Sequence, residues 1–162
     1  AKEKIAAEFD RLLKHKKIIT LSIDKIRNVL CIYTDTLYCQ HPNTKQYHEI
    51  GKFRIEIKLN KSGVKIYWFN LTRQVEGMEE EMNAPHVWKD GTACLGTAES
   101  NLHESIANHE YYQTVILAIQ FIETANYERH SHLKLESWPL VEGYKPGQKK
   151  KSGKKLPPDK TR

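Results

Sequence analysis

Cys94 and His86 are the two residues whose types and spacing suit covalent chemistry in this chain. Cys94 follows the turn signal Asp90-Gly91, and His86 directly follows Pro85. Proline fixes φ and removes a backbone donor, and glycine takes positive φ without steric cost, so we expect irregular backbone here. Such loops often carry catalytic side chains. A thiol with an imidazole nearby suits acyl transfer, because a thiolate attacks carbonyl carbon and histidine donates or accepts protons.

The segment from Met82 to Gly96 resembles the active-site segment of ubiquitin-conjugating enzymes. That family has a His-Pro-Asn tripeptide, then a glycine turn, then the catalytic cysteine, usually followed by Leu. Here Ala84-Pro85-His86 occupies the tripeptide, and His86 lies eight residues before Cys94, the family's spacing between Asn and Cys. Ala84 in place of His and His86 in place of Asn depart from the pattern. The segment is also similar to divergent prokaryotic members, with Pro-His before the turn and Cys-Leu-Gly after it. The positions that match in register are Val87, Gly91, Cys94 and Leu95.

This resemblance implies that Cys94 accepts a ubiquitin-like modifier as a thioester from an activating enzyme and transfers it to a lysine of a protein substrate. His86 would take the place of the family Asn and stabilise the oxyanion or orient the loop. A role as a base and a purely packing role are the alternatives. Asn126, 32 residues past Cys94, would guide the attacking amine, with Glu128 and His130 as neighbours and helix capping as the alternative. No cofactor and no metal are expected. A prokaryotic origin and a role in antiviral defence are further hypotheses from the resemblance.

Other functions remain open at this point. A catalytically inactive, ubiquitin-conjugating-like binding module would account for the departures at Ala84 and His86. A cysteine hydrolase built on Cys94 and His86 would need a third group that the sequence does not identify. A zinc site has the weakest support, because the spacings match no common zinc pattern and a second thiol is lacking. Its candidate ligands are His86, Cys94, His103 and His109.

The charge distribution divides the chain into two parts. The 162 residues carry a net charge of +6, but residues 145–162 hold eight Lys and Arg against Asp159, a net of +7, which leaves −1 for residues 1–144. We therefore predict a single domain over residues 1–144 and a basic disordered tail over residues 145–162. The tail could make weak, sequence-independent contacts with nucleic acid, or its lysines could be modification targets.

Cysteine use and hydropathy point to an intracellular protein. No apolar run is long enough for a signal peptide or a membrane span, so we expect cytoplasmic localisation and no membrane contact. The odd cysteine count argues against a disulfide framework. Cys31 and Cys39 lie in a β-like run and are expected to be small buried hydrophobic residues.

The elements that would position Cys94 follow an α+β order. An amphipathic helix is predicted over residues 2–16, with an apolar stripe of Ile5, Phe9, Leu12 and Leu13. Antiparallel strands are predicted at 18–23, 29–33, 50–59 and 64–70, the third with a solvated outer face. Residues 38–48 form a loop in which His41-Pro42-Asn43 is a hairpin turn rather than the active-site tripeptide. After the Cys94 loop and a polar linker at 97–101, one long central helix is predicted over 103–127, packed on the sheet. This order is similar to the ubiquitin-conjugating fold over roughly residues 1–130, and residues 128–144 would add a strand or a short closing segment.

Overall fold

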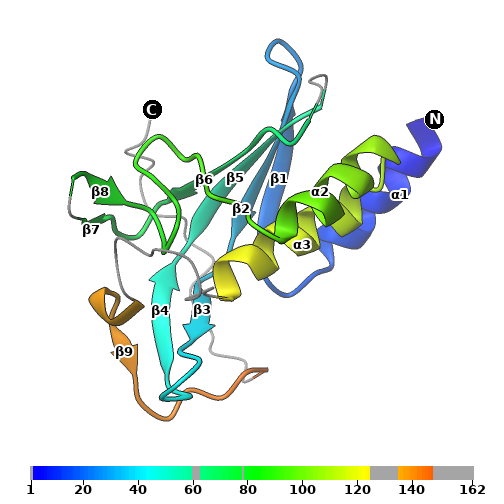
Figure 1. Cartoon of the computed structure of the whole chain (residues 1–162). Helices are drawn as coiled ribbons and strands as arrows, with labels where there is room; N and C mark the ends of the chain where they lie inside the picture. The colour runs from blue at the N-terminus through cyan, green and yellow to red at the C-terminus, as the bar shows by residue number, and fades with distance from the viewer. Residues whose placement is uncertain (1, 60–62, 78, 125–134, 148–162) are drawn as a thin grey trace.

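The structure is a computed structural model that describes residues 2–59, 63–77, 79–124 and 135–147, of which residues 2–5 are described in backbone only. Helices and antiparallel sheets occur together, which confirms the predicted α+β class (Figure 1). Asn126, Glu128 and His130 lie outside the described residues, as does the tail from residue 148. No helix in the described part of the chain is long and apolar enough to cross a membrane.

The main sheet is four-stranded and antiparallel throughout, in the order β1-β2-β5-β6. Its strands confirm the four predicted ones to within a few residues at their ends. Between β2 and β5 the chain leaves this sheet to form a β3–β4 hairpin, which belongs to a second sheet of order β3-β4-β9. The strand bounds are β1 Ile18–Asp24, β2 Val29–Thr34, β3 Leu37–Gln40, β4 Tyr47–Gly51, β5 Phe53–Lys58, β6 Ile66–Asn70 and β9 Leu140–Val141.

The predicted loop over residues 38–48 is wrong in part, because Leu37–Gln40 forms β3 and pairs with β4. The His41-Pro42-Asn43 segment is the hairpin turn, as predicted. His41 is buried, and its Nδ1 accepts the backbone N–H groups of Asn43 and Thr44 at 3.1 and 3.3 Å. Its Nε2 lies 2.6 Å from Oε1 of Glu136 in the 3-10 helix Leu135–Ser137. Thus His41 holds the hairpin turn against the closing segment.

The single long helix predicted over residues 103–127 is also wrong. The structure has α2 at Ala98–Ala107 and α3 at Tyr111–Glu123, so the helical region begins inside the predicted polar linker and then breaks. The break is a Schellman motif: His109 takes a φ of 56° and its N–H donates to Ile106, while the N–H of Glu110 donates to Ser105. The Oγ atoms of Ser105 and Thr114 then lie 2.8 Å apart across the corner, both buried.

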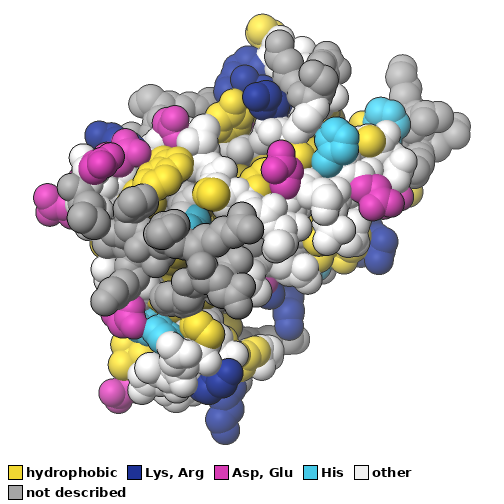
Figure 2. All heavy atoms as spheres, viewed as in Figure 1, with side chains coloured by type: hydrophobic (Ala, Val, Ile, Leu, Met, Phe, Trp, Pro, Cys, Tyr) yellow, Lys and Arg dark blue, Asp and Glu magenta, His cyan; other side chains and the backbone are white. Residues whose placement is uncertain are grey.

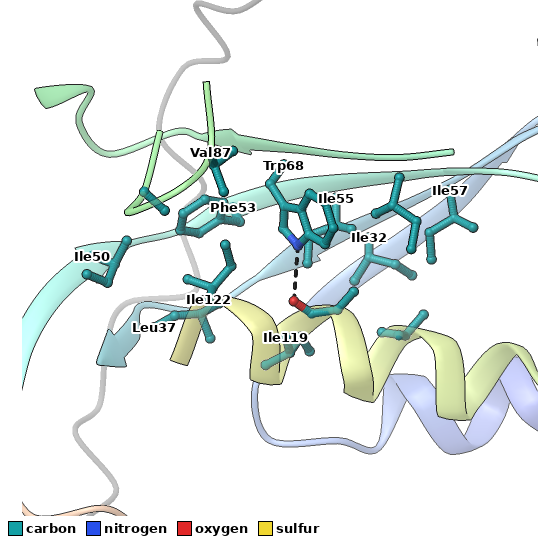
Figure 3. Close-up of a cluster of buried hydrophobic side chains, with 14 of the residues drawn as sticks. Ile32, Leu37, Ile50, Phe53, Ile55, Ile57, Trp68, Val87, Ile119 and Ile122 are labelled. Carbon is teal, nitrogen blue, oxygen red and sulfur yellow. Dashed lines mark hydrogen bonds between the residues drawn. The ribbon is translucent and has the colours of Figure 1, made fainter. Parts of the chain in front are cut away.

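The helices lie on one face of the main sheet, and α3 makes the central contact with it (Figure 1). Trp68 of β6 is fully buried, and its Nε1–H donates to the Ala118 carbonyl in α3 at 3.0 Å (Figure 3). Ile119 and Ile122 face the same sheet surface. Helix α1, Lys2–Leu13, buries Leu12 as predicted, but Leu13, predicted on the same apolar stripe, is the last residue of the helix and is 49% exposed.

The opposite face of β5 is not the solvated surface that its alternating sequence predicted. Arg54 and Glu56 are buried, with Arg54 Nε donating to Glu56 Oε2 at 2.9 Å. Arg27 covers the second carboxylate oxygen at 3.0 Å, and the Arg54 guanidinium lies 4.5 Å from the centre of the Phe69 ring. Charged side chains can be buried here because each has an ionic or aromatic partner.

Candidate active site

Cys94 is the exposed thiol among the three cysteines, whereas Cys31 and Cys39 are buried in β2 and β3. The contrast follows from packing on either side of Cys94. Ala93 and Leu95 are partly buried and pack against the hydrophobic core. Because neighbouring side chains of extended backbone point to opposite sides, anchoring residues 93 and 95 inward directs the thiol outward.

His86 and Cys94 are opposite each other in a short antiparallel pairing within the loop. Val87 bridges Ala93, the Trp88 N–H donates to the Thr92 carbonyl at 2.9 Å, and the Cys94 N–H donates to the His86 carbonyl at 3.2 Å. The spacing of eight residues between His86 and Cys94 is therefore the length that lets the chain reverse at the tight turn Trp88–Gly91 and return opposite His86. The structure thus brings the predicted pair, His86 and Cys94, together through a backbone hydrogen bond.

A second turn sets the position of His86. The Val87 N–H donates to the Ala84 carbonyl at 3.0 Å, so Ala84–Val87 is a β-turn with Pro85 at its second position. His86 takes a φ of 63° at the third position, as type II turns require. Glycine and asparagine are the usual residues there, and histidine is among the few others that tolerate left-handed backbone. Val87 then anchors the loop, because its side chain is fully buried and lies beside Phe53 and Trp68 (Figure 3).

Gly91 attaches the loop to the edge of the main sheet. Its carbonyl accepts the backbone N–H of Trp68 at 2.9 Å, so the loop covers part of the otherwise open edge of β6. Gly91 has a φ of 86°, and a Cβ at this position would lie 2.8 Å from ring carbons of Phe69. Both the backbone angle and the close approach therefore require glycine here.

Asp90 closes the tight turn before Gly91. Its Oδ1 accepts the Thr92 hydroxyl at 2.6 Å and the Thr92 backbone N–H at 3.0 Å. These two hydrogen bonds lower the pKa of Asp90 from its ordinary value, because they favour the ionised carboxylate. The turn is thus held by an anion at neutral pH.

Asn83 is the structural residue that sequence reasoning missed. It is fully buried, and its Nδ2 donates to the carbonyls of Trp88 and Lys89 at 2.6 and 3.4 Å. Its Oδ1 accepts the Asn70 backbone N–H at 2.9 Å and the Gln74 side chain at 3.1 Å. The sequence shows only a polar residue directly before the tripeptide, because the groups that Asn83 bonds come together around it only in the fold.

The candidate zinc ligands do not form a metal site in the described part of the chain. His103 and His109 are exposed, on α2 and just beyond it, and no group of three or more His, Cys, Asp or Glu in the described ranges could hold a metal. Acidic side chains gather on the small hairpin that precedes the loop, β7 Val75–Glu76 and β8 Glu81–Met82 (Figure 2). Its exposed acids are Glu76, Glu79, Glu80 and Glu81.

The loop therefore presents an exposed thiol on backbone that is fixed at several points. Such an arrangement can form a covalent adduct with a carbonyl on a large partner, because the sulfur is accessible. Gly96 and Thr97, which follow in the chain, are exposed as well. No protein-family model, curated protein or solved structure matches this chain.

Proposed function

We propose that this chain is a ubiquitin-conjugating-like acyltransferase in which Cys94 carries a ubiquitin-like modifier as a thioester. The observation that supports this most directly is the exposed Cys94 thiol, held opposite His86 by the hydrogen bond from its own N–H to the His86 carbonyl. A carrier cysteine has to reach the thiolate of one large partner and then the amine of another. An exposed sulfur on fixed backbone suits both encounters.

The order of elements also supports the proposal. The chain has an N-terminal helix, then a four-stranded antiparallel sheet, then the cysteine loop, and then helices packed on the sheet. This is similar to the order that the resemblance implies. The β3–β4 hairpin is an insertion relative to a simple four-strand meander. It does not interrupt the β6-to-α2 connection that carries Cys94.

Two exchanges make up the reaction. The Cys94 thiolate attacks the carbonyl carbon of the modifier's C-terminal thioester on the activating enzyme, a new C–S bond forms, and the enzyme's thiolate leaves. The amine of a substrate lysine then attacks the Cys94 thioester, loses a proton, and forms an amide while the Cys94 thiolate departs. The first exchange is close to isoenergetic, and the second is driven by amide formation.

His86 has two parts to play in this proposal. Its left-handed backbone fixes the type II turn, which explains why a histidine can stand where the family has asparagine. Its imidazole N–H would donate to the oxyanion that forms at the thioester carbonyl, and loss of one such donor costs about 10²–10³ in rate. A role for His86 as the base that accepts the amine proton is the competing assignment.

A non-reducing gel tests the carrier role. The chain is incubated with ATP, a candidate activating enzyme and its ubiquitin-like partner, alongside Cys94→Ala, Cys94→Ser and the matched control Cys31→Ala. The expected result is a thiol-sensitive adduct with wild type and Cys31→Ala, a thiol-resistant adduct with Cys94→Ser, and none with Cys94→Ala. Absence of any adduct while the activating enzyme itself becomes charged contradicts the carrier role for that pair.

The inactive binding module is the second candidate, and the departures at Ala84 and His86 favour it. The two functions differ in a binding measurement. A module would bind the modifier with equal affinity in wild type and Cys94→Ala and form no adduct with any charged activating enzyme tested. A carrier forms the thioester and discharges it to free lysine.

A further inference from the structure

The tip of the β1–β2 hairpin exposes an isoleucine almost completely. Ile26 is 97% exposed, whereas the other large hydrophobic residues exposed in the described part of the chain, Leu13, Ile23 and Leu140, range from 38% to 49%. Ile23 lies on the same hairpin, three residues before Ile26. Single exposed apolar residues are common on proteins, so exposure alone does not mark a binding surface. Two further features of this tip indicate a binding surface.

First, the backbone that carries Ile26 is fixed. Asp24 Oδ1 accepts the N–H groups of Ile26 and Arg27 at 3.1 and 3.0 Å. Asn28 completes the turn with a φ of 53°, and its carbonyl accepts the Leu59 N–H at 3.1 Å, which ties the tip to the neighbouring β5–β6 connection. An apolar side chain on pre-organised backbone loses little conformational entropy when a partner covers it.

Second, the exposed charge around Ile26 is positive. Lys25 and Arg27 flank it in sequence, and Lys58 and Lys65 lie at the adjacent end of the sheet, where the Lys58 N–H donates to the Lys65 carbonyl. The nearby acids Asp24 and Glu56 are both engaged by Arg27, and the Glu56 side chain is only 5% exposed. Figure 2 shows a hydrophobic group at the end of this hairpin with Lys and Arg side chains directly below it.

We propose that this tip is a docking prong for a protein partner that offers an apolar socket rimmed by Asp and Glu side chains. Ile26 would enter the socket, while Lys25 and Lys65 would pair with the acidic rim. This is the usual division of labour in protein interfaces, where a buried apolar anchor supplies most of the affinity and charged rims guide association. The proposal is independent of the chemistry proposed for Cys94.

The prong lies away from the Cys94 loop. That loop is hydrogen-bonded to β6 at Trp68, three residues after Lys65. At about 3.3 Å per residue, Trp68 and Lys65 are about 10 Å apart along the strand. The hairpin tip lies beyond the Lys65 end of β6.

A membrane and a second copy of the chain fit the tip less well. A single myristoyl chain, several times larger than an isoleucine side chain, gives only marginal membrane binding, so one Ile26 would not anchor the protein. The acidic β7–β8 hairpin of a second copy would supply carboxylates, but its described apolar side chains form no socket, because Met82 is buried and Val75 packs against the core.

Peptide selection tests the prong. The full chain is used to select from a phage-displayed library of random peptides, with the Ile26→Ser variant as the counter-selection target. We expect peptides that combine large apolar residues with several Asp or Glu. Their affinity, measured by titration calorimetry, should fall about tenfold or more in Ile26→Ser, and should fall again in Lys25→Glu and at high salt. Leu13→Ser, at a half-exposed apolar residue on α1, is the control and should leave affinity unchanged.

Three outcomes would overturn the proposal. The first is that no peptide distinguishes wild type from Ile26→Ser, although thermal denaturation shows both folded. The second is that the selected peptides lack acidic residues or ignore Lys25→Glu. The third is Ile26-dependent binding to vesicles of phosphatidylcholine and phosphatidylserine, or Ile26-dependent self-association in sedimentation, without any peptide binding.

Discussion

Asn83 and Asn70 bond to each other in both directions. The Asn83 Oδ1 accepts the Asn70 backbone N–H at 2.9 Å, and the Asn70 Nδ2 donates to the Asn83 backbone carbonyl at 3.0 Å. Both residues are buried. The end of β6 and the start of the cysteine loop are therefore joined by hydrogen bonds that water does not compete for.

Replacing Asn83 with Ala should destabilise the fold by about 2–3 kcal/mol, because the Asn70 N–H would be left buried without its acceptor and the Trp88 carbonyl would lose one of its two donors. Urea unfolding measures the change. Asn101→Ala, at an exposed position of α2, is the control and should change stability by less than about 0.7 kcal/mol. Equal effects of the two substitutions would show that the Asn83 amide does not hold the loop.

Gly91→Ala should destabilise more than Gly96→Ala. Both glycines have positive φ, at 86° and 54°, but a Cβ at Gly91 would meet the Phe69 ring at 2.8 Å whereas nothing lies within 4 Å at Gly96. Each substitution costs about 1–2 kcal/mol for the left-handed backbone, and Gly91→Ala should cost about 1–3 kcal/mol more for the overlap. Thermal or urea unfolding of the two variants measures the difference, which is the cost of the steric overlap with Phe69.

Substitutions of His86 should follow backbone tolerance of positive φ. We expect His86→Asn and His86→Gly to keep the stability of the wild type within about 1 kcal/mol, and His86→Val to lose about 1–2 kcal/mol or more, because a β-branched residue at a φ of 63° is strained. Calorimetric unfolding checks this order. If His86→Val were as stable as His86→Asn, the turn at Ala84–Val87 would not be the reason for the residue type.

Cys94 should be labelled selectively in the folded protein. Iodoacetamide at neutral pH should modify one thiol per chain, because Cys31 and Cys39 are 2% and 0% exposed. Intact-mass spectrometry counts the labels, and Cys94→Ser should reduce the count to zero. In urea all three cysteines should react, which controls for intrinsic reactivity. Early labelling of Cys31 in native protein would contradict the packing of β2 against β5.

The Asp90 turn should make stability depend on pH in the acidic range. Hydrogen bonds from Thr92 lower the pKa of Asp90 in the folded state, so its contribution is present above the unfolded pKa and is lost as pH falls below about 4, through the folded pKa. Thr92→Val removes the hydroxyl and should raise the Asp90 pKa toward its ordinary value. An NMR titration of the Asp90 carboxyl carbon measures the shift, with exposed Glu99 as the internal reference.

Local patterns were sufficient to predict the N-terminal helix and the four strands of the main sheet. The strict alternation of Phe53, Ile55 and Ile57 predicted β5, because one face of a sheet must be apolar to be buried. The same alternation does not indicate whether the polar face of the strand is exposed to solvent. Arg54 and Glu56 are buried because Arg27, distant in sequence, completes their ion pairs, and a contact of that kind has no local signal.

The break between α2 and α3 was missed although its signal was present. Asn108 and His109 both tolerate the left-handed backbone of a helix C-terminus, yet the apolar period continues across them, and the period was given more weight than the cap residues. At the candidate site, the spacing of His86 and Cys94 was visible in the sequence. Asn83 was not recognised, because its role depends on Trp88 and Asn70 converging around it in space.

The β3–β4–β9 sheet has a consequence for synthesis on the ribosome. One side of β4 pairs with β3 at once, but its other side pairs only with Leu140–Val141. As the chain emerges, roughly ninety residues must follow β4 before that pairing becomes possible, at about 5–20 residues per second. During those seconds the Tyr47–Gly51 edge is an open template for strand addition by neighbouring chains. The nascent chain thus exposes a strand edge that β9 covers at Tyr47 and His48 once folding is complete.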